Sequence, residues 1–129
     1  MAQGIIARLK ANNLAGKVPV TGQDASVPGL QAILKGTQCM TVYKDTNLEA
    51  KAASDLAIAL IKGDQAKADS LATGSVKDTE TGKDVKSVLA TPQAIFQDSV
   101  KTVISDGFQK ASDVCTGEYA SLCKKYGVQ

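Results

Sequence analysis

The chain has 129 residues, 43% of them hydrophobic and 22% charged, which is the composition of one ordinary globular domain. Fifteen basic and thirteen acidic residues leave a net charge of +2 without a basic cluster, so nucleic-acid binding is not indicated. The absence of histidine excludes histidine-based triads and general bases and removes the commonest zinc ligand.

The first expected element is a helix over about residues 3–13, with Ile5, Ile6 and Leu9 apolar and Gly16 past its end. No capping residue precedes this helix, and the opening residues do not have the pattern of a signal peptide. We therefore expect a truncated or processed chain, and a frayed N-terminal helix is the simpler alternative. No apolar run reaches the length of a membrane span, so we expect no membrane insertion.

The stretch that follows predicts a βαβ unit. Two β-prone runs, Val18–Thr21 and Cys39–Val42, enclose three apolar residues with the spacing of one helix stripe: Leu30, Ile33 and Leu34. Pro28 near the start of that helix and Gly36 just past its end occupy positions where these residues are favoured. The short connections favour a right-handed unit with parallel strands, and hence an α/β fold.

Asp24 and Lys44 lie just beyond the C-terminal ends of these two expected strands. Parallel strands end at the same edge of a sheet, where α/β proteins bind ligands, and neighbouring strands are about 4.8 Å apart. A carboxylate accepts hydrogen bonds from hydroxyls and an ammonium donates to them, so the pair suits a polyhydroxylated ligand such as a sugar. Two solvated loop ends explain the same spacing equally well.

The strongest helix signal comes next, with Thr46 and Glu49 as a capping box and a helix over about residues 47–62. Its apolar residues cover a wide surface, which another part of a protein has to bury.

The rest of the chain predicts shorter elements. Residues 64–84 are polar and contain glycine, so they predict a linker and a hairpin around Thr79–Lys83. Asp98 is expected to cap a short helix, and Thr116 a final helix over about residues 117–125.

Two motifs identify a family. The runs VTGQDA at residues 20–25 and MTVYKD at residues 40–45, with AGKVP before them and SVLATP and DGF after them, resemble the xylose-binding and multiple-sugar-binding periplasmic proteins of ABC importers. The resemblance extends through nearly the whole chain. It implies that Asp24 and Lys44 form hydrogen bonds with the sugar, and that Gln23 is a weaker third candidate.

The resemblance also implies the domain organisation. Members of this type I periplasmic-binding-protein family have two α/β lobes joined by three crossovers, so we expect an incomplete parallel-sheet βαβ lobe here. Residues 1–44 correspond to the C-terminal lobe, 45–91 to a crossover segment of the other lobe, and 92–129 to the tail of the C-terminal lobe. Leu89–Pro92 is then a hinge candidate. The helix over residues 47–62 is expected to pack on a second copy of the chain or on the first sheet.

An exported protein of this family is expected to link Cys115 and Cys123 in a disulfide that closes a small loop. Cys39, within an expected strand, predicts a buried free thiol. Three cysteines without histidine or CxxC spacing make a weak case for a metal site. No catalytic motif or phosphate-binding loop appears, so we expect neither a cofactor nor enzymatic activity.

The leading hypothesis is therefore the C-terminal part of a sugar-binding component of an ABC transport system, with a xylose-like monosaccharide as ligand. Its parent protein is expected in the periplasm or at the cell surface, with an ABC permease as partner. The aromatic residue that usually stacks on a sugar is not visible at the predicted site. An effector-sensing module of a lactose-repressor-type regulator and a stand-alone dimerising lobe are the two alternatives.

Overall fold

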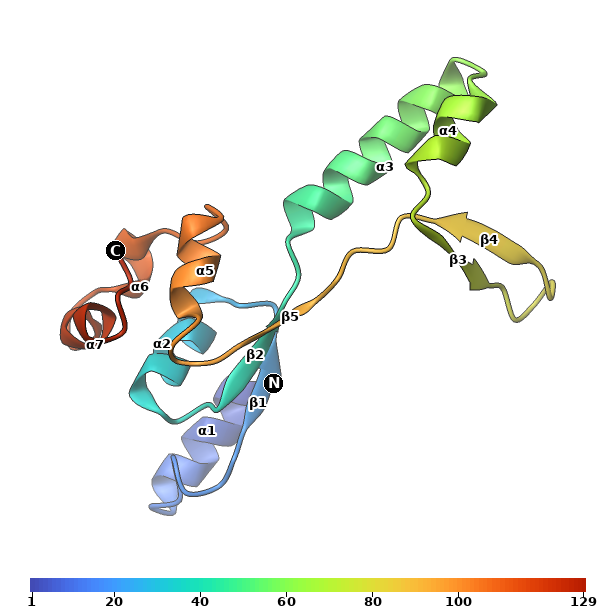
Figure 1. Cartoon of the computed structure of the whole chain (residues 1–129). Coiled ribbons are helices and arrows are strands. Elements are labelled where there is room, and N and C mark those ends of the chain that lie inside the picture. The colour runs from blue at the N-terminus through green and yellow to red at the C-terminus, as the bar shows by residue number, and fades with distance from the viewer. The chain divides into compact units, whose positions relative to one another are not determined.

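The computed structural model describes residues 1–129, and the chain divides into two compact units. Unit 1 comprises residues 1–44 and 92–129, and unit 2 comprises residues 45–91. The expected α/β chain with a parallel strand pair is confirmed, and Figure 1 shows its helices and strands. None of the helices combines the length and the apolar character that crossing a membrane requires.

A three-stranded sheet forms the centre of unit 1. Its strands are β1 (Thr21–Gln23), β2 (Met40–Tyr43) and β5 (Gln93–Ile95), and β2 lies between the other two (Figure 1). β1 runs parallel to β2, as expected, whereas β5 is antiparallel to β2, so the sheet is mixed. The sequence did not predict β5, because three residues directly after Pro92 are too few to show an alternating pattern.

The first strand begins and ends later in the chain than expected. It starts at Thr21 and not at Val18, and it ends at Gln23. Pro19 has no N–H to donate to a ladder, so the segment around it does not pair as a strand. Gly22 and Gln23, which were expected in the following loop, instead pair with β2.

Two helices belong to the N-terminal half of unit 1: α1 (Ala2–Ala11) and α2 (Val27–Lys35). Pro28 lies in the first turn of α2, and Gly36 ends the helix with a φ of +79°, which favours glycine. The predicted apolar stripe is buried in the core, together with side chains from the sheet and from the C-terminal helices. These core residues include Leu30, Ile33, Leu34, Tyr43, Ile95, Val100, Val103 and Val114.

Three short helices follow β5: α5 (Val100–Ser105), α6 (Ala111–Val114) and α7 (Tyr119–Lys125). The two expected caps are wrong. Ser99 rather than Asp98 precedes α5, and Glu118 rather than Thr116 precedes α7, because a hydrogen-bonded turn comes before each helix. α6 was not predicted, since four residues carry too little periodicity.

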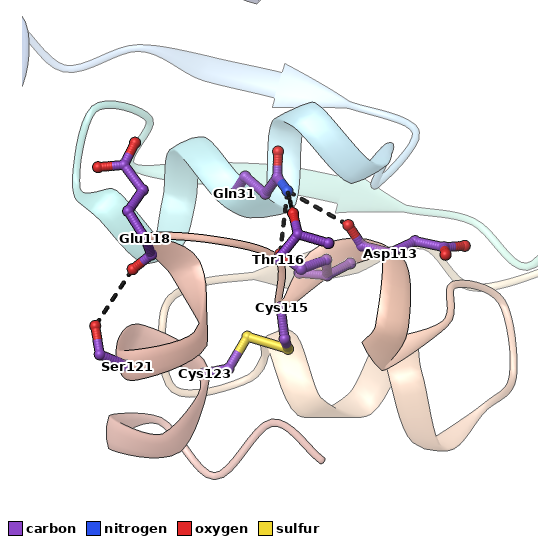
Figure 2. The surroundings of a disulfide bond; sticks show 8 residues. Gln31, Asp113, Cys115, Thr116, Glu118, Ser121 and Cys123 are labelled. Carbon is purple, nitrogen blue, oxygen red and sulfur yellow. Dashed lines mark hydrogen bonds between the residues drawn. A yellow bond between two sulfur atoms is a disulfide. The ribbon is translucent and has the colours of Figure 1, made fainter.

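A disulfide joins Cys115 to Cys123, as expected, and links the end of α6 to α7 (Figure 2). Gln31 of α2 holds the same segment, because its Nε2 donates to the backbone oxygen of Val114 at 3.1 Å. Figure 2 shows this amide pointing at the chain just before the disulfide, with Thr116 Oγ1 as a further acceptor at 3.4 Å. The C-terminal helices are thereby attached to α2.

Cys39 is free, but the prediction that it is buried is wrong. The residue precedes the first residue of β2 and lines an open cavity of about 510 Å³ with Phe96 and Tyr126. It therefore lies at the border of the core and remains exposed to solvent.

Unit 2 contains two helices and a hairpin: α3 (Thr46–Ile61), α4 (Gln65–Leu71), β3 (Gly74–Lys77) and β4 (Asp84–Ser87). The expected capping box is wrong by one residue, because Asp45 caps α3 and its Oδ1 accepts from Asn47 N at 2.9 Å. The hairpin is confirmed, and Val76 pairs with Val85.

Helix α4 lies where the sequence predicted a linker. Its seven residues, QAKADSL, have too few apolar positions to show a stripe. The helix is capped by Asp64, which accepts from Lys67 N, and it packs on α3 where Ala59 and Ala68 are both buried.

We expect the double variant Cys115→Ser/Cys123→Ser to lower the free energy of unfolding of unit 1 by about 2–3 kcal/mol, because the cross-link restricts the unfolded chain. Urea denaturation followed by circular dichroism measures the change. Cys39→Ser is the matched control, since this cysteine is free and exposed, and its unfolding curve should match that of the unsubstituted chain. Equal losses in the two variants would contradict a stabilising role for the cross-link.

Candidate functional site

Asp24 and Lys44 lie side by side at the C-terminal edge of the β1–β2 pair. Asp24 follows the last residue of β1, and Lys44 follows the last residue of β2. The register pairs Gln23 with Val42, and Lys44 Nζ lies 3.3 Å from Asp24 Oδ1. The structure therefore brings together the two charged groups that the sequence singled out. We call this edge, formed by Gln23, Asp24 and Lys44, the rim.

Both charged groups of the rim remain accessible. The side chain of Asp24 is 69% exposed and that of Lys44 is 35% exposed. An ion pair in this setting contributes at most about 1 kcal/mol to stability, because solvent screens both charges. A ligand that accepts from Lys44 and donates to Asp24 therefore gives up little binding free energy by separating the two charges.

The backbone at Asp24 has an unusual conformation. Asp24 and Ala25 have φ angles of +77° and +43°, and left-handed backbone costs a non-glycine residue about 1–2 kcal/mol. Asp24 N donates to Val42 O at 2.8 Å, and Ala25 N donates to Thr41 Oγ1 at 3.3 Å. Ala25 is fully buried in the core below the rim. These contacts hold the turn in the conformation that presents Asp24 to Lys44.

Gln23 ends β1 and is exposed. It lines, with Asp24, an open cavity of about 490 Å³ that extends between β1 and the first residues of α1 and α2. The side chain of Gln38 lies beneath this strand. It is 2% exposed, and its Nε2 donates to Met40 O at 3.0 Å. Gln23 thus faces the same open space as Asp24.

The sequence missed two residues that shape the rim, Thr41 and Gln38. Both are buried polar residues, and each contacts a segment far from it in sequence. Thr41 was assigned only as a strand residue, because its partner Ala25 lies 16 positions away. The polar character of Thr41 in an otherwise apolar strand was the available signal.

The aromatic neighbour of the rim faces the core. Tyr43 is 1% exposed, and its ring centroid lies 5.1 Å from that of Phe108. It cannot stack on a ligand bound outside the rim. The rim therefore offers hydrogen-bonding groups and no exposed aromatic ring. The chain has no cluster of three or more acidic, cysteine or histidine side chains suited to hold a metal ion.

The family model described as periplasmic binding protein domain matches residues 1–65, which is half of the chain. The chain therefore belongs to the periplasmic-binding-protein domain family, as its motifs indicated.

Curated relatives agree with this family. The chain is 42% identical over 114 residues to the D-xylose-binding periplasmic protein of Escherichia coli (strain K12), which covers 88% of this chain and 33% of the relative. It is 33% identical over 114 residues to the D-xylose-binding periplasmic protein of Haemophilus influenzae, a match that covers 88% of this chain and 32% of that relative. It is 36% identical over 104 residues to a multiple sugar-binding periplasmic receptor of Rhizobium radiobacter, a match that covers 76% of this chain and 27% of that relative. The chain spans about a third of the length of these relatives.

We expect Gly22→Ala to lower the free energy of unfolding by about 1–3 kcal/mol, the usual cost of an added methyl group in a packed region. A Cβ at position 22 would collide with Nε2 of Gln38, which is buried and already bonded to Met40 O. Thermal denaturation measures the change.

The matched control is Gly4→Ala, because a Cβ there meets nothing within 4 Å and Gly4 lies in the exposed part of α1. That substitution should raise stability by about 0.5–1 kcal/mol, since alanine favours the helix. A Gly22→Ala variant as stable as the unsubstituted chain would contradict the packing of Gln38 under β1.

Proposed function

We propose that this chain supplies part of the sugar-binding site of a solute-binding protein, and that its ligand is a neutral monosaccharide such as D-xylose. The observation that carries the proposal is the Asp24–Lys44 pair, 3.3 Å apart and accessible at adjoining strand ends. A carboxylate can accept a hydrogen bond from one hydroxyl while the ammonium beside it donates to the next, and the two charges balance each other around a neutral ligand. The names of the relatives, which refer to D-xylose and to multiple sugars, support this ligand class.

Each group of the rim has a role in this proposal. Asp24 accepts hydrogen bonds from two adjacent sugar hydroxyls, and Lys44 donates to a hydroxyl or to the ring oxygen. Gln23 is the third contact, because its amide can both donate and accept. The rim is proposed to bind its ligand without catalysing a reaction and without a cofactor.

The parent protein is proposed to act in the periplasm or at the cell surface and to deliver its sugar to an ABC permease. In this proposal unit 1 is part of one lobe, and unit 2 is a crossover segment of the other. Closure of two lobes around the sugar would form the surface that a permease recognises. The relatives are named as periplasmic proteins, which favours transport over the interpretation as a transcriptional regulator.

Sugar binding is tested by titrating the chain with D-xylose in a calorimeter. We expect Asp24→Asn and Lys44→Met each to weaken the affinity by about 10- to 100-fold, because each removes a charge-assisted hydrogen bond worth about 1.5–3 kcal/mol. Lys51→Met is the control, since Lys51 forms a comparable ion pair with Asp55 at 2.6 Å in unit 2. It should bind D-xylose as the unsubstituted chain does.

Two results would contradict the proposal. One is the absence of heat with D-xylose and with glucose, arabinose and ribose. The other is equal binding by Asp24→Asn, Lys44→Met and Lys51→Met, which would place the ligand away from the rim.

A second candidate function is self-association through α3, which the exposed surface of unit 2 favours. Helix α3 carries apolar side chains that are more than half exposed: Leu48, Ile58, Leu60 and Ile61. Beside it lies a groove of about 560 Å³ whose apolar lining includes Leu48, Leu56, Val88 and Leu89. We infer that a second copy of the chain covers this surface when no other lobe is present.

Light scattering at increasing protein concentration tests the association. We expect the mass to rise toward that of a dimer, and the double variant Leu60→Glu/Ile61→Glu to remain a monomer, because burying two carboxylates in an apolar interface is unfavourable. Leu14→Glu is the control, since Leu14 is an exposed apolar residue of unit 1. A monomer at every concentration would rule out the dimer.

A further inference from the structure

The turn after β1 is unusual because two successive non-glycine residues, Asp24 and Ala25, have positive φ angles. The third non-glycine residue with positive φ is Asn13, a residue type that tolerates this conformation. Alanine does not gain a local side-chain hydrogen bond that would favour it there. The turn therefore depends on contacts with the rest of unit 1, and strained turns of this kind are concentrated at functional sites.

Two strands supply those contacts. Ala25 is fully buried, and its N–H donates to the hydroxyl oxygen of Thr41, a residue that is itself 1% exposed. The preceding N–H, that of Asp24, donates to Val42 O in β2 at 2.8 Å. A buried N–H without an acceptor is costly, so the Thr41 hydroxyl favours the left-handed conformation at Ala25 over a turn that faces another way.

We propose that Thr41 is a positioning residue for the rim. Its hydroxyl fixes Ala25, which sets the direction of the Asp24 carboxylate, while the same strand ends just before Lys44, which presents the ammonium. One strand, β2, would thus set the geometry of both charged groups. The expected effect of Thr41 on affinity rests on the proposed sugar-binding function. Its effect on the conformation of the turn does not depend on that function.

The test compares three variants of the whole chain. Thr41→Val removes the acceptor with little change in shape, and Thr41→Ser keeps it. Thr37→Val is the matched control, because Thr37 Oγ1 donates to Ala32 O at 3.2 Å and makes no contact with the turn. Nuclear magnetic resonance gives the exchange rate of the Ala25 amide and the amide–Hα coupling of Asp24, which reports its φ. Calorimetry with D-xylose gives the affinity.

In Thr41→Val we expect the Ala25 amide to exchange about tenfold faster or more, the Asp24 coupling to change, and the affinity for D-xylose to fall about tenfold. Thr41→Ser and Thr37→Val should keep the Ala25 exchange rate, the Asp24 coupling and the affinity of the unsubstituted chain. If Thr41→Val does not fold, Thr41→Ala is compared with Thr41→Ser in the same measurements.

Unchanged Ala25 exchange and Asp24 coupling in Thr41→Val would overturn the inference, whatever happens to affinity. If the unsubstituted chain binds no sugar, the proposed function fails, and the exchange and coupling measurements still decide the role of Thr41. If those two values change while the affinity stays the same, Thr41 shapes the turn but does not position a binding group, which also overturns the proposal.

Discussion

The parallel pairing of β1 with β2 is the interaction on which the rim depends. Its register places Gln23 opposite Val42, so the residues that follow each strand emerge next to each other. A shift of the pairing by one residue would turn every side chain of β1 to the other face of the sheet. The side chain of Asp24 would then point away from Lys44, and Ala25, now fully buried, would no longer lie in the core.

The layers below the rim stabilise this register. Helix α2 covers the sheet with Leu30, Ile33 and Leu34, and Gln31 on the same helix attaches the C-terminal segment that the disulfide closes. A rigid support of this kind lowers the entropy lost when a ligand binds, because the binding groups are already ordered. The strained turn at Asp24 and Ala25 is tolerated for the same reason, since buried contacts on both sides hold it.

Unit 2 has a different character. Its packed helices α3 and α4 bury the small residues Ala59 and Ala68, while larger apolar side chains of α3 remain exposed. A surface of this kind is expected where a segment belongs to a larger assembly. The chain belongs to the periplasmic-binding-protein domain family and spans about a third of the length of its curated relatives.

The sequence by itself determined the features that depend on local pattern. The apolar spacing of α2 with Pro28 and Gly36, the parallel strands, the hairpin and the proximity of Asp24 to Lys44 follow from periodicity, turn residues and strand direction. Only the tertiary structure decided β5, α4 and α6, which are too short to show a period. It also decided the exposure of Cys39 and the roles of Thr41 and Gln38. These depend on contacts between segments distant in sequence, and no local pattern records which partner a buried hydroxyl or amide will meet.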